Sequence, residues 1–278
     1  MRPKQWLKNL LVLAAPVAAG ALFEPGVLAA TMAAFVSFCL VSSAVYCVND
    51  VADAEADRLH PRKRFRPVAS RQLAPRVALG WAAVLAVASL AIAAATDLAL
   101  LAVVASYLLM QLAYAYRLKN EPVLDITVVT LGFLLRAVAG GLGADLAISQ
   151  WFLLVAGFGS LFIVAGKRYS ELHTLGSNTG TRRSLIHYSD TYLRFVWSMA
   201  AAATVMSYSL WAFEMSASAH VPWHMISIGP FVLGLMRYAV DIDAGTAAEP
   251  EDIVLADRGL QLIGVLWLVV VCLGILDV

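Results

Sequence analysis

The sequence predicts an all-α polytopic membrane protein: one domain, residues 1–278, with nine transmembrane helices around a cavity that faces the cytosol. Two observations predict this class. First, 61% of the residues are apolar, whereas a soluble domain has about 45–50%. Second, the apolar residues fall in blocks of roughly 17–24, the length that crosses the hydrocarbon of a bilayer. Such a chain leaves no room for a sizeable soluble domain.

The expected spans, in chain order, are 10–23, 27–48, 77–95, 98–115, 123–143, 151–166, 194–214, 222–239 and 259–276. The basic residues support this count, because 19 of the 20 Lys and Arg fall before the first span, in alternate loops or at the span ends that border these loops. The exception is Arg136, which lies inside the fifth span. The positive-inside rule then predicts a multi-pass protein of the cytoplasmic membrane, with its N-terminus in the cytosol and its C-terminus outside.

The first acidic cluster follows the second span and consists of Asn49, Asp50, Asp53 and Asp57. On one continuous helix the three carboxylates would fall within a sector of about 60°. Such a stripe can bind Mg²⁺ or Mn²⁺ and leave coordination positions for phosphate oxygens, with Asn49 contributing from the edge. The alternative is a solvated acidic helix end, neutralised by the basic residues that follow it: Arg58, Arg62, Lys63 and Arg64.

The next loop, 60–67, is strongly basic and ends in Arg66-Pro67. A basic cytosolic loop fixes topology and attracts anionic lipid. Beside a metal site, arginines also make good phosphate clamps because of their planar fork of donors. For any single residue of this loop, both interpretations stay open.

Several motifs together resemble the UbiA superfamily of intramembrane transferases. The first is Asn49-Asp50-x-x-Asp53-x-x-x-Asp57 followed by Arg66-Pro67. The others are the segments 2–9 (RPKQWLKN), 164–172 (VAGKRYSEL), 192–197 (YLRFVW), 237–243 (RYAVDID) and 249–253 (EPEDI). The resemblance covers nearly the whole chain. It implies a nine-helix fold with two cytosolic acidic motifs that bind Mg²⁺ and a diphosphate, and it points to the branch that transfers phosphoribosyl groups to decaprenyl phosphate.

The second acidic cluster departs from the usual pattern of the superfamily, in which a second Asp-x-x-x-Asp stripe binds a prenyl diphosphate. Here Asp241 and Asp243 are two residues apart, so they diverge on a regular helix. Gly245 and Pro250 then interrupt regular structure before the remaining acids, Glu249, Glu251 and Asp252. The pattern favours an irregular acidic cup that holds sugar hydroxyls or a second cation. A solvated acidic loop is the alternative.

Further candidates for substrate binding lie at the cytosolic ends of spans. Lys119 follows Tyr116, close to the Tyr and Lys spacing of the superfamily. The matching motifs add Lys8, Lys167, Arg168, Tyr169, Glu171 and Tyr192. Each could instead be an interfacial side chain that reaches toward water. Arg136 is costly inside a membrane, so we expect it to line a polar cavity near the lipid phosphate or to pair with a buried acid.

The resemblance implies a Mg²⁺- or Mn²⁺-dependent enzyme of cell-wall arabinan precursor synthesis. Its substrates would be 5-phosphoribosyl 1-diphosphate and a polyprenyl phosphate. We expect it to lie in the membrane and not to bind nucleic acid. The sequence leaves a homo-oligomer open. Two alternatives remain. A prenyltransferase of the same fold would act on an aromatic or quinone precursor. A lipid or ion transporter would need acids along its path, whereas this chain gathers its acids at one face.

Overall fold

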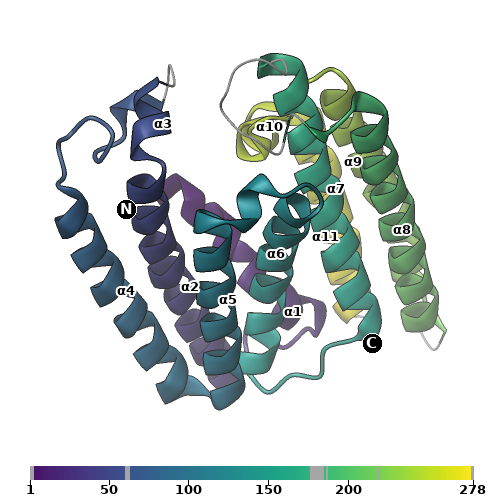
Figure 1. The fold of residues 1–278 in the computed structure, drawn as a ribbon. Helices are drawn as coiled ribbons and strands as arrows, with labels where there is room; N and C mark the ends of the chain where they lie inside the picture. The colour runs from purple at the N-terminus through teal and green to yellow at the C-terminus, as the bar shows by residue number, and fades with distance from the viewer. Residues whose placement is uncertain (1–2, 60–62, 176–184, 186, 218–219, 277–278) are drawn as a thin grey trace. The chain divides into compact units, whose positions relative to one another are not determined.

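A computed structural model describes residues 3–59, 63–175, 185, 187–217 and 220–276. Within this part of the chain every regular element is a helix and no strand occurs, which confirms the predicted class (Figure 1). The described residues form two compact units, one up to Ile148 and one from Ser149 onward. The prediction of a single domain is not tested by this division.

The first unit contains nine helical elements, three of them short 3₁₀ turns or helices labelled η. They are η1 (Pro3–Leu13), α1 (Ala14–Ala18), α2 (Pro25–Ala52), α3 (Ala54–Leu59), η2 (Lys63–Phe65), α4 (Pro75–Thr96), α5 (Leu98–Tyr116), η3 (Leu118–Asn120) and α6 (Leu124–Gly143). The second unit contains α7 (Gln150–Leu175), α8 (Asp190–Ser216), α9 (Trp223–Asp243), α10 (Pro250–Ala256) and α11 (Arg258–Leu276).

Eight of the predicted spans are confirmed as helices long and apolar enough to cross a membrane, namely α2, α4, α5, α6, α7, α8, α9 and α11. The first segment differs, because residues 3–18 form η1 and the short α1 and not one long α-helix. A 3₁₀ helix rises about 2.0 Å per residue against 1.5 Å in an α-helix, so this segment still extends roughly 30 Å. The count of nine therefore stays a prediction.

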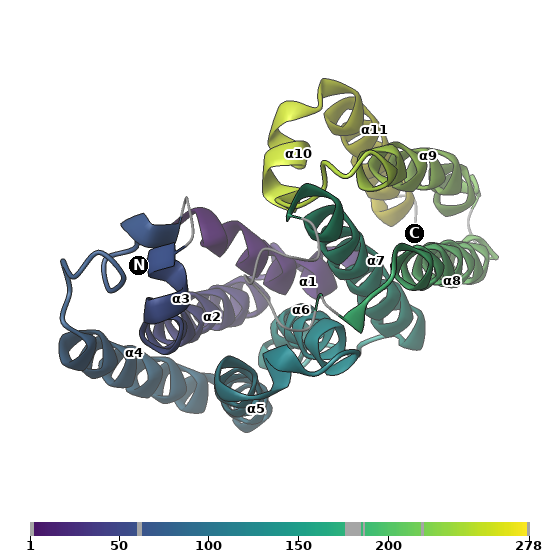
Figure 2. The same ribbon diagram turned by 45° about the horizontal axis from the view of Figure 1, so that its top comes forward.

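The core of the first unit forms around α2, which packs against α4, α5 and α6. Figure 2 shows these helices side by side. Phe38 of α2 and Val104 and Tyr107 of α5 are buried there among small alanine and valine side chains. Small side chains allow membrane helices to approach closely. One polar link fastens the layer, since Ser89 Oγ of α4 donates a hydrogen bond of 2.7 Å to the carbonyl of Ser37 in α2.

The N-terminal segment packs tightly on α6 because α6 offers glycines there. A Cβ added at Gly140 would lie 1.7 Å from the carbonyl oxygen of Val12, and one at Gly141 would lie 3.2 Å from the Cβ of Ala15. No side chain larger than hydrogen fits at Gly140 without moving the backbone of η1. The glycines at the end of the fifth predicted span thus permit the N-terminal segment to approach α6 closely.

The second unit joins its helices through aromatic side chains. The ring of Tyr208 on α8 stacks on Phe231 of α9 at 3.9 Å between centroids. Its hydroxyl accepts a hydrogen bond of 2.8 Å from the indole of Trp267 on α11 and shares another of 2.6 Å with Ser227. Buried tyrosine and tryptophan need such partners for their polar atoms. The three helices are therefore tied together at one point.

Candidate active site

The first acidic cluster lies where α2 ends and α3 begins. The predicted continuous helix is interrupted at Asp53, whose φ of −98° and ψ of 5° end α2. The interruption is small, because the Asp57 N–H still donates to the Asp53 carbonyl at 2.8 Å and the Asp53 N–H to the Asn49 carbonyl at 2.9 Å. Asp50 on α2 and Asp57 on α3 consequently stay on one side of the chain.

Arg66 joins these two carboxylates. Its Nη1 lies 2.7 Å from Asp57 Oδ2, as a hydrogen bond, and 3.4 Å from Asp50 Oδ1. The Asp57 side chain is 5% exposed and that of Asp50 13%. A carboxylate as buried as Asp57 is costly unless it is paired and hydrogen-bonded, so the guanidinium stabilises it.

The third carboxylate has a different partner. Asp53, which is more exposed, forms an ion pair and hydrogen bond with the ammonium of Lys119 on η3. The η3 turn follows α5 directly, and Asp53 follows α2 directly. The packing of α5 against α2 therefore brings together two residues 66 positions apart in the sequence.

Two residues of the alternative neutralising set have other partners in the structure. Arg58 Nε donates to the backbone carbonyl of Ala69 at 3.2 Å, and Arg64 lies over the ring of Phe65 at 4.8 Å. Arg62 lies outside the described residues. Arg66 and Lys119 do meet the carboxylates, and the sequence marked both as substrate-binding candidates. A role of Lys63 in neutralising the cluster stays a prediction.

A divalent metal ion fits Asp50 and Asp57 better than the full predicted set. Two carboxylate oxygens from these residues already converge on one cationic nitrogen, Arg66 Nη1, which stands in for an ion. Mg²⁺ is usually held by one or two carboxylates together with substrate phosphates. Among the described residues no three acidic, histidine or cysteine side chains gather into a closed metal site. Asn49 and Asp53 as ligands stay predictions.

Arg136 is buried, at 5% exposure, and its hydrogen bonds go to groups other than a buried acid. Its Nε donates to Asn9 Oδ1 at 2.8 Å, Nη2 to the hydroxyl of Tyr107 at 2.6 Å and Nη1 to the carbonyl of Gly132 at 2.8 Å. Among the described residues these hydrogen-bond partners are all uncharged. Arg136 thus links α6 to η1 and α5, and a role with lipid phosphate stays a prediction.

Lys8 lies on η1 and Tyr192 on α8, so the structure places them in different units. Lys8 Nζ donates to Gln5 Oε1 at 2.7 Å. The ring of Tyr192 stacks on Tyr188 at 5.7 Å between centroids. The substrate roles of both residues stay predictions.

In the second unit, the cations of α7 meet acids of two elements. Arg168, which is buried, donates to Glu171 Oε2 at 2.7 Å. Lys167 Nζ lies 3.8 Å from Glu171 Oε1 and 3.4 Å from Glu249 Oε2. The ion pair with Glu249 connects α7 to the residue that precedes α10. The structure therefore brings together four of the candidates, Lys167, Arg168, Glu171 and Glu249.

A second ionic link runs through α7, α8 and α9. Arg194 Nη2 donates to the hydroxyl of Tyr169 at 2.7 Å and lies 3.1 Å from Asp243 Oδ1. Sequence reasoning did not single out Arg194 as a site residue. The signal for it was its place in the 192–197 motif, but its partners become visible only when the three helices pack.

The acids near the end of α9 do not converge on one point. Asp241 accepts hydrogen bonds from Thr246 through its backbone carbonyl at 3.0 Å and its carboxylate at 3.4 Å. The predicted irregularity is confirmed at Gly245, whose φ is +73°. After it, however, Glu251 and Asp252 lie in the first turn of the short helix α10 and not in a loop. Proline at the first position of α10 favours this helix.

Asp257 pairs elsewhere. Its Oδ2 accepts a hydrogen bond of 2.8 Å from Arg237 Nε, and its Oδ1 accepts from the backbone N–H of Gly259 at 2.8 Å at the start of α11. The hydrogen bond from Arg237 is the main cause that lowers the pKa of this carboxyl. This arrangement caps α11 and explains Asp257 without a substrate.

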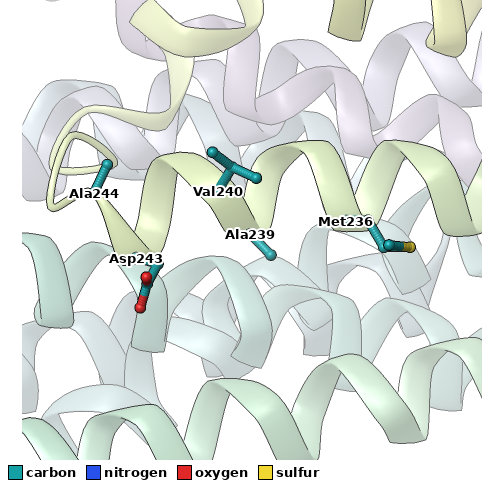
Figure 3. Close-up of a pocket in the computed structure, with 5 residues that line it drawn as sticks. All are labelled: Met236, Ala239, Val240, Asp243 and Ala244. Atoms are coloured by element: carbon teal, nitrogen blue, oxygen red, sulfur yellow. The ribbon is translucent and has the colours of Figure 1, made fainter.

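A hollow of about 450 Å³ follows one face of α9 and is lined by Met236, Ala239, Val240, Asp243 and Ala244. Figure 3 shows Met236, Ala239 and Asp243 along one flank of the helix and Val240 and Ala244 on the other. The lining is apolar except at Asp243, which is paired with Arg194. The hollow therefore runs from an apolar end toward an ion pair.

The comparisons with known proteins agree with the fold. A profile described as the UbiA prenyltransferase family matches residues 10–255. A protein of Mycobacterium tuberculosis named decaprenyl-phosphate phosphoribosyltransferase is 51% identical, over 98% of this chain and 91% of its own length. Its counterpart of the same name from Mycolicibacterium smegmatis is 49% identical, over 96% of this chain and 88% of its own length.

A solved structure has the same fold. The structure of a UbiA homolog from Archaeoglobus fulgidus bound to GPP and Mg2+ superposes with a TM-score of 0.75. It covers 99% of this chain and 97% of that one, at 18% sequence identity. At this identity the likeness concerns the course of the helices.

Proposed function

The chain belongs to the UbiA prenyltransferase family, and on that premise we propose that it is a membrane phosphoribosyltransferase. It transfers the 5-phosphoribosyl group from 5-phosphoribosyl 1-diphosphate to a polyprenyl phosphate, with decaprenyl phosphate as the natural acceptor, and releases diphosphate. The observation that carries this proposal is the identity of about half the residues, over nearly the whole chain, with relatives that bear the name of this activity.

The first unit supplies the residues for the diphosphate end of the donor. Asp50 and Asp57 would hold a Mg²⁺ ion, for which Mn²⁺ is the substitute to test, and Asp53 lies one turn away. Such an ion, when bound, acts as a Lewis acid that stabilises negative charge on the leaving diphosphate. Arg66 and Lys119 are the cations within reach of the same carboxylates and would bind phosphate oxygens.

The second unit supplies acids suited to a sugar. Asp243, Glu249 and Asp252 can accept hydrogen bonds from ribose hydroxyls, which a prenyl diphosphate lacks. Lys167 and Arg168 offer positive charge to phosphate oxygens, and Arg194 holds Asp243 in place. This chemistry explains why the second cluster differs from the stripe that prenyl diphosphate users carry.

The reaction needs orientation and charge more than proton transfer. The phosphate oxygen of the acceptor lipid is already anionic, so it can attack the anomeric carbon without a strong general base. The bond from that carbon to the diphosphate oxygen breaks, and the transition state has oxocarbenium character as in other glycosyl transfers. Residues that hold the two anions in line therefore contribute most of the rate.

The proposed setting is the cytoplasmic membrane, with the acidic motifs on the cytosolic side. Within the described part of the chain, eight helices are long and apolar enough to cross a bilayer, which supports a place in the membrane. The alternation of basic and bare loops supports the orientation. A soluble phosphorylated sugar donor would reach the acidic residues from the cytosol, while the isoprenoid tail stays in the bilayer.

The test supplies the purified protein with two different donors, each with its own acceptor, in separate reactions. With Mg²⁺, decaprenyl phosphate and 5-phosphoribosyl 1-diphosphate, we expect a phosphoribosylated lipid. With polyprenyl diphosphate and an aromatic acid such as 4-hydroxybenzoate, we expect no product. Prenylation of the aromatic acid together with no use of the phosphoribosyl donor would assign the chain to the aromatic prenyltransferases.

A further inference from the structure

Arg66 contacts the two carboxylates that would hold a metal ion. Its Nη1 lies between Asp57 Oδ2 at 2.7 Å and Asp50 Oδ1 at 3.4 Å. A magnesium ion needs oxygen ligands at about 2.0–2.1 Å in near-octahedral geometry. The carboxylate oxygens that now face the guanidinium are the ones such an ion would take, and the two cations would repel each other there. A metal ion bound by these same oxygens would therefore compete with the present contact of Arg66.

The backbone holds Arg66 near the site even when its side chain moves. Its N–H donates to the carbonyl of Lys63 at 2.9 Å, and its own carbonyl accepts from the N–H of Ser70 at 2.8 Å. The side chain is 24% exposed, so it can turn toward solvent without opening the core. A displaced guanidinium would remain beside the carboxylates with its donors available.

Lys119 neutralises Asp53 as Arg66 neutralises Asp57 and Asp50. It pairs with this carboxylate through its ammonium, and both side chains are partly exposed. Asp53 immediately precedes α3, which carries Asp57 in its first turn. A metal ion at Asp57 would therefore lie within one helical turn of Asp53. Two cations of this unit thus contact carboxylates of the acidic motif.

We infer that Arg66 and Lys119 are exchangeable counter-ions: they neutralise the aspartates of the metal-free protein, and a divalent ion releases them to bind diphosphate oxygens. This rests on the metal and diphosphate of the proposed function and adds an order of events to it. Before the metal ion binds, the carboxylates of Asp57 and Asp50 attract the guanidinium. After it binds, the phosphates of the diphosphate attract the guanidinium. The guanidinium fork suits phosphate oxygens at least as well as two carboxylates on different helices.

The exchange predicts opposite effects from one substitution. Without Arg66 the metal ion no longer competes with a built-in cation, so its affinity for the free protein rises. The diphosphate loses a charge-assisted partner, so its affinity for the metal-loaded protein falls. A residue that only supported the fold would weaken both. Reciprocal linkage also requires that diphosphate strengthen metal binding less in the variant than in the wild type.

The experiment titrates the full chain in detergent by calorimetry, first with Mg²⁺ alone and then with inorganic pyrophosphate at saturating Mg²⁺. For Arg66→Gln we expect Mg²⁺ to bind several-fold more tightly. We expect pyrophosphate to bind roughly 10- to 150-fold more weakly, the range of one charge-assisted hydrogen bond. The matched control is Arg64→Gln, which removes the same charge two residues away. Arg64 contacts the ring of Phe65 and, among the described residues, no carboxylate.

The inference is overturned if Arg66→Gln weakens Mg²⁺ binding, leaves it unchanged, or matches Arg64→Gln in both titrations. Should Arg66→Gln fail to fold, Lys119→Gln carries the same pair of expectations, because its partner Asp53 is more exposed. Phosphoribosyl transfer is not measured in these titrations. Suppose that Arg66→Gln binds Mg²⁺ more tightly and pyrophosphate more weakly, as expected, but that the wild type transfers no phosphoribosyl group. The proposed function would then be refuted, and the counter-ion exchange would stand.

Discussion

The guanidinium of Arg136 donates a hydrogen bond of 2.8 Å to the side-chain carbonyl of Asn9, joining α6 to η1 across 127 positions of sequence. Asn9 is itself fully buried, and its amide reaches Cys39 Sγ and Ser42 Oγ of α2 at 3.3 Å each. The first predicted span is therefore held to the bundle by polar contacts as well as by packing. This relationship gives the unusual N-terminal segment a defined place.

The first prediction follows from this network. Arg136→Gln should lower the free energy of unfolding by about 2–4 kcal/mol, because Asn9 and Tyr107 lose a buried, charge-assisted donor. Asn9→Ala should cost a similar amount, and the double variant should cost less than the sum, since the two residues share one bond. Thermal unfolding in detergent measures this. Unchanged stability with weakened decaprenyl phosphate binding would instead support the role at the lipid phosphate.

The second prediction concerns the glycines of α6. Gly140→Ala should destabilise the protein by about 3 kcal/mol or more, because the new Cβ would lie 1.7 Å from the Val12 carbonyl oxygen. Gly80→Ala on α4 is the control, because an added Cβ there meets nothing within 4 Å. That variant should be neutral or up to about 1 kcal/mol more stable, as alanine favours a helix. Equal unfolding temperatures for both variants would contradict the close packing of η1 on α6.

The third prediction separates donor from acceptor binding. Asp243→Asn should weaken the affinity for 5-phosphoribosyl 1-diphosphate roughly 10-fold or more, the loss of one charged hydrogen bond. The affinity for decaprenyl phosphate should change much less. Ala239→Ser, on the same face of α9, is a control for disturbance of the hollow. If Asp243→Asn weakened only lipid binding, the sugar assignment of this segment would be wrong.

The fourth prediction tests topology by labelling single cysteines from each side of a sealed membrane. The background lacks Cys39, Cys47 and Cys272. Cysteines placed at Gln72 and Ala248 should react only with reagent on the cytosolic side. Cysteines at Gly26 and Ala147 should react only from outside, because the basic loops remain in the cytosol. A swap of either pair between the two sides would remove the common cytosolic face of the acidic motifs.

Hydropathy was sufficient to predict the long helices, since a block of apolar residues must cross the bilayer as a helix. Hydropathy did not predict where these helices end when their last turns are polar. The predicted span 151–166 continues as α7 to Leu175, because Lys167, Arg168 and Tyr169 extend the helix beyond the apolar block. The 3₁₀ form of η1 was also not predictable, because it depends on the contacts of Asn9 and on Gly140, far away in sequence.

The site was predictable as a set of residue types and not as a set of pairs. The spacing of Asp50, Asp53 and Asp57 indicated one face of a helix, and Asp50 and Asp57 do share a partner. That this partner is Arg66, and that Lys119 takes Asp53, depends on how a turn and a neighbouring helix fold back. Arg194 was missed for the same reason, because its partners lie on α7 and α9.

The most direct measurement follows two labels of the donor, one in the ribose carbons and one in the β-phosphorus, with decaprenyl phosphate, Mg²⁺ and the purified protein. The account predicts that the ribose label moves into the lipid fraction while the phosphorus label stays in water as diphosphate, in equal amounts. Asp57→Asn should abolish both changes and remain folded. Phosphorus label in the lipid, or ribose label that stays in water with the active wild type, would contradict phosphoribosyl transfer.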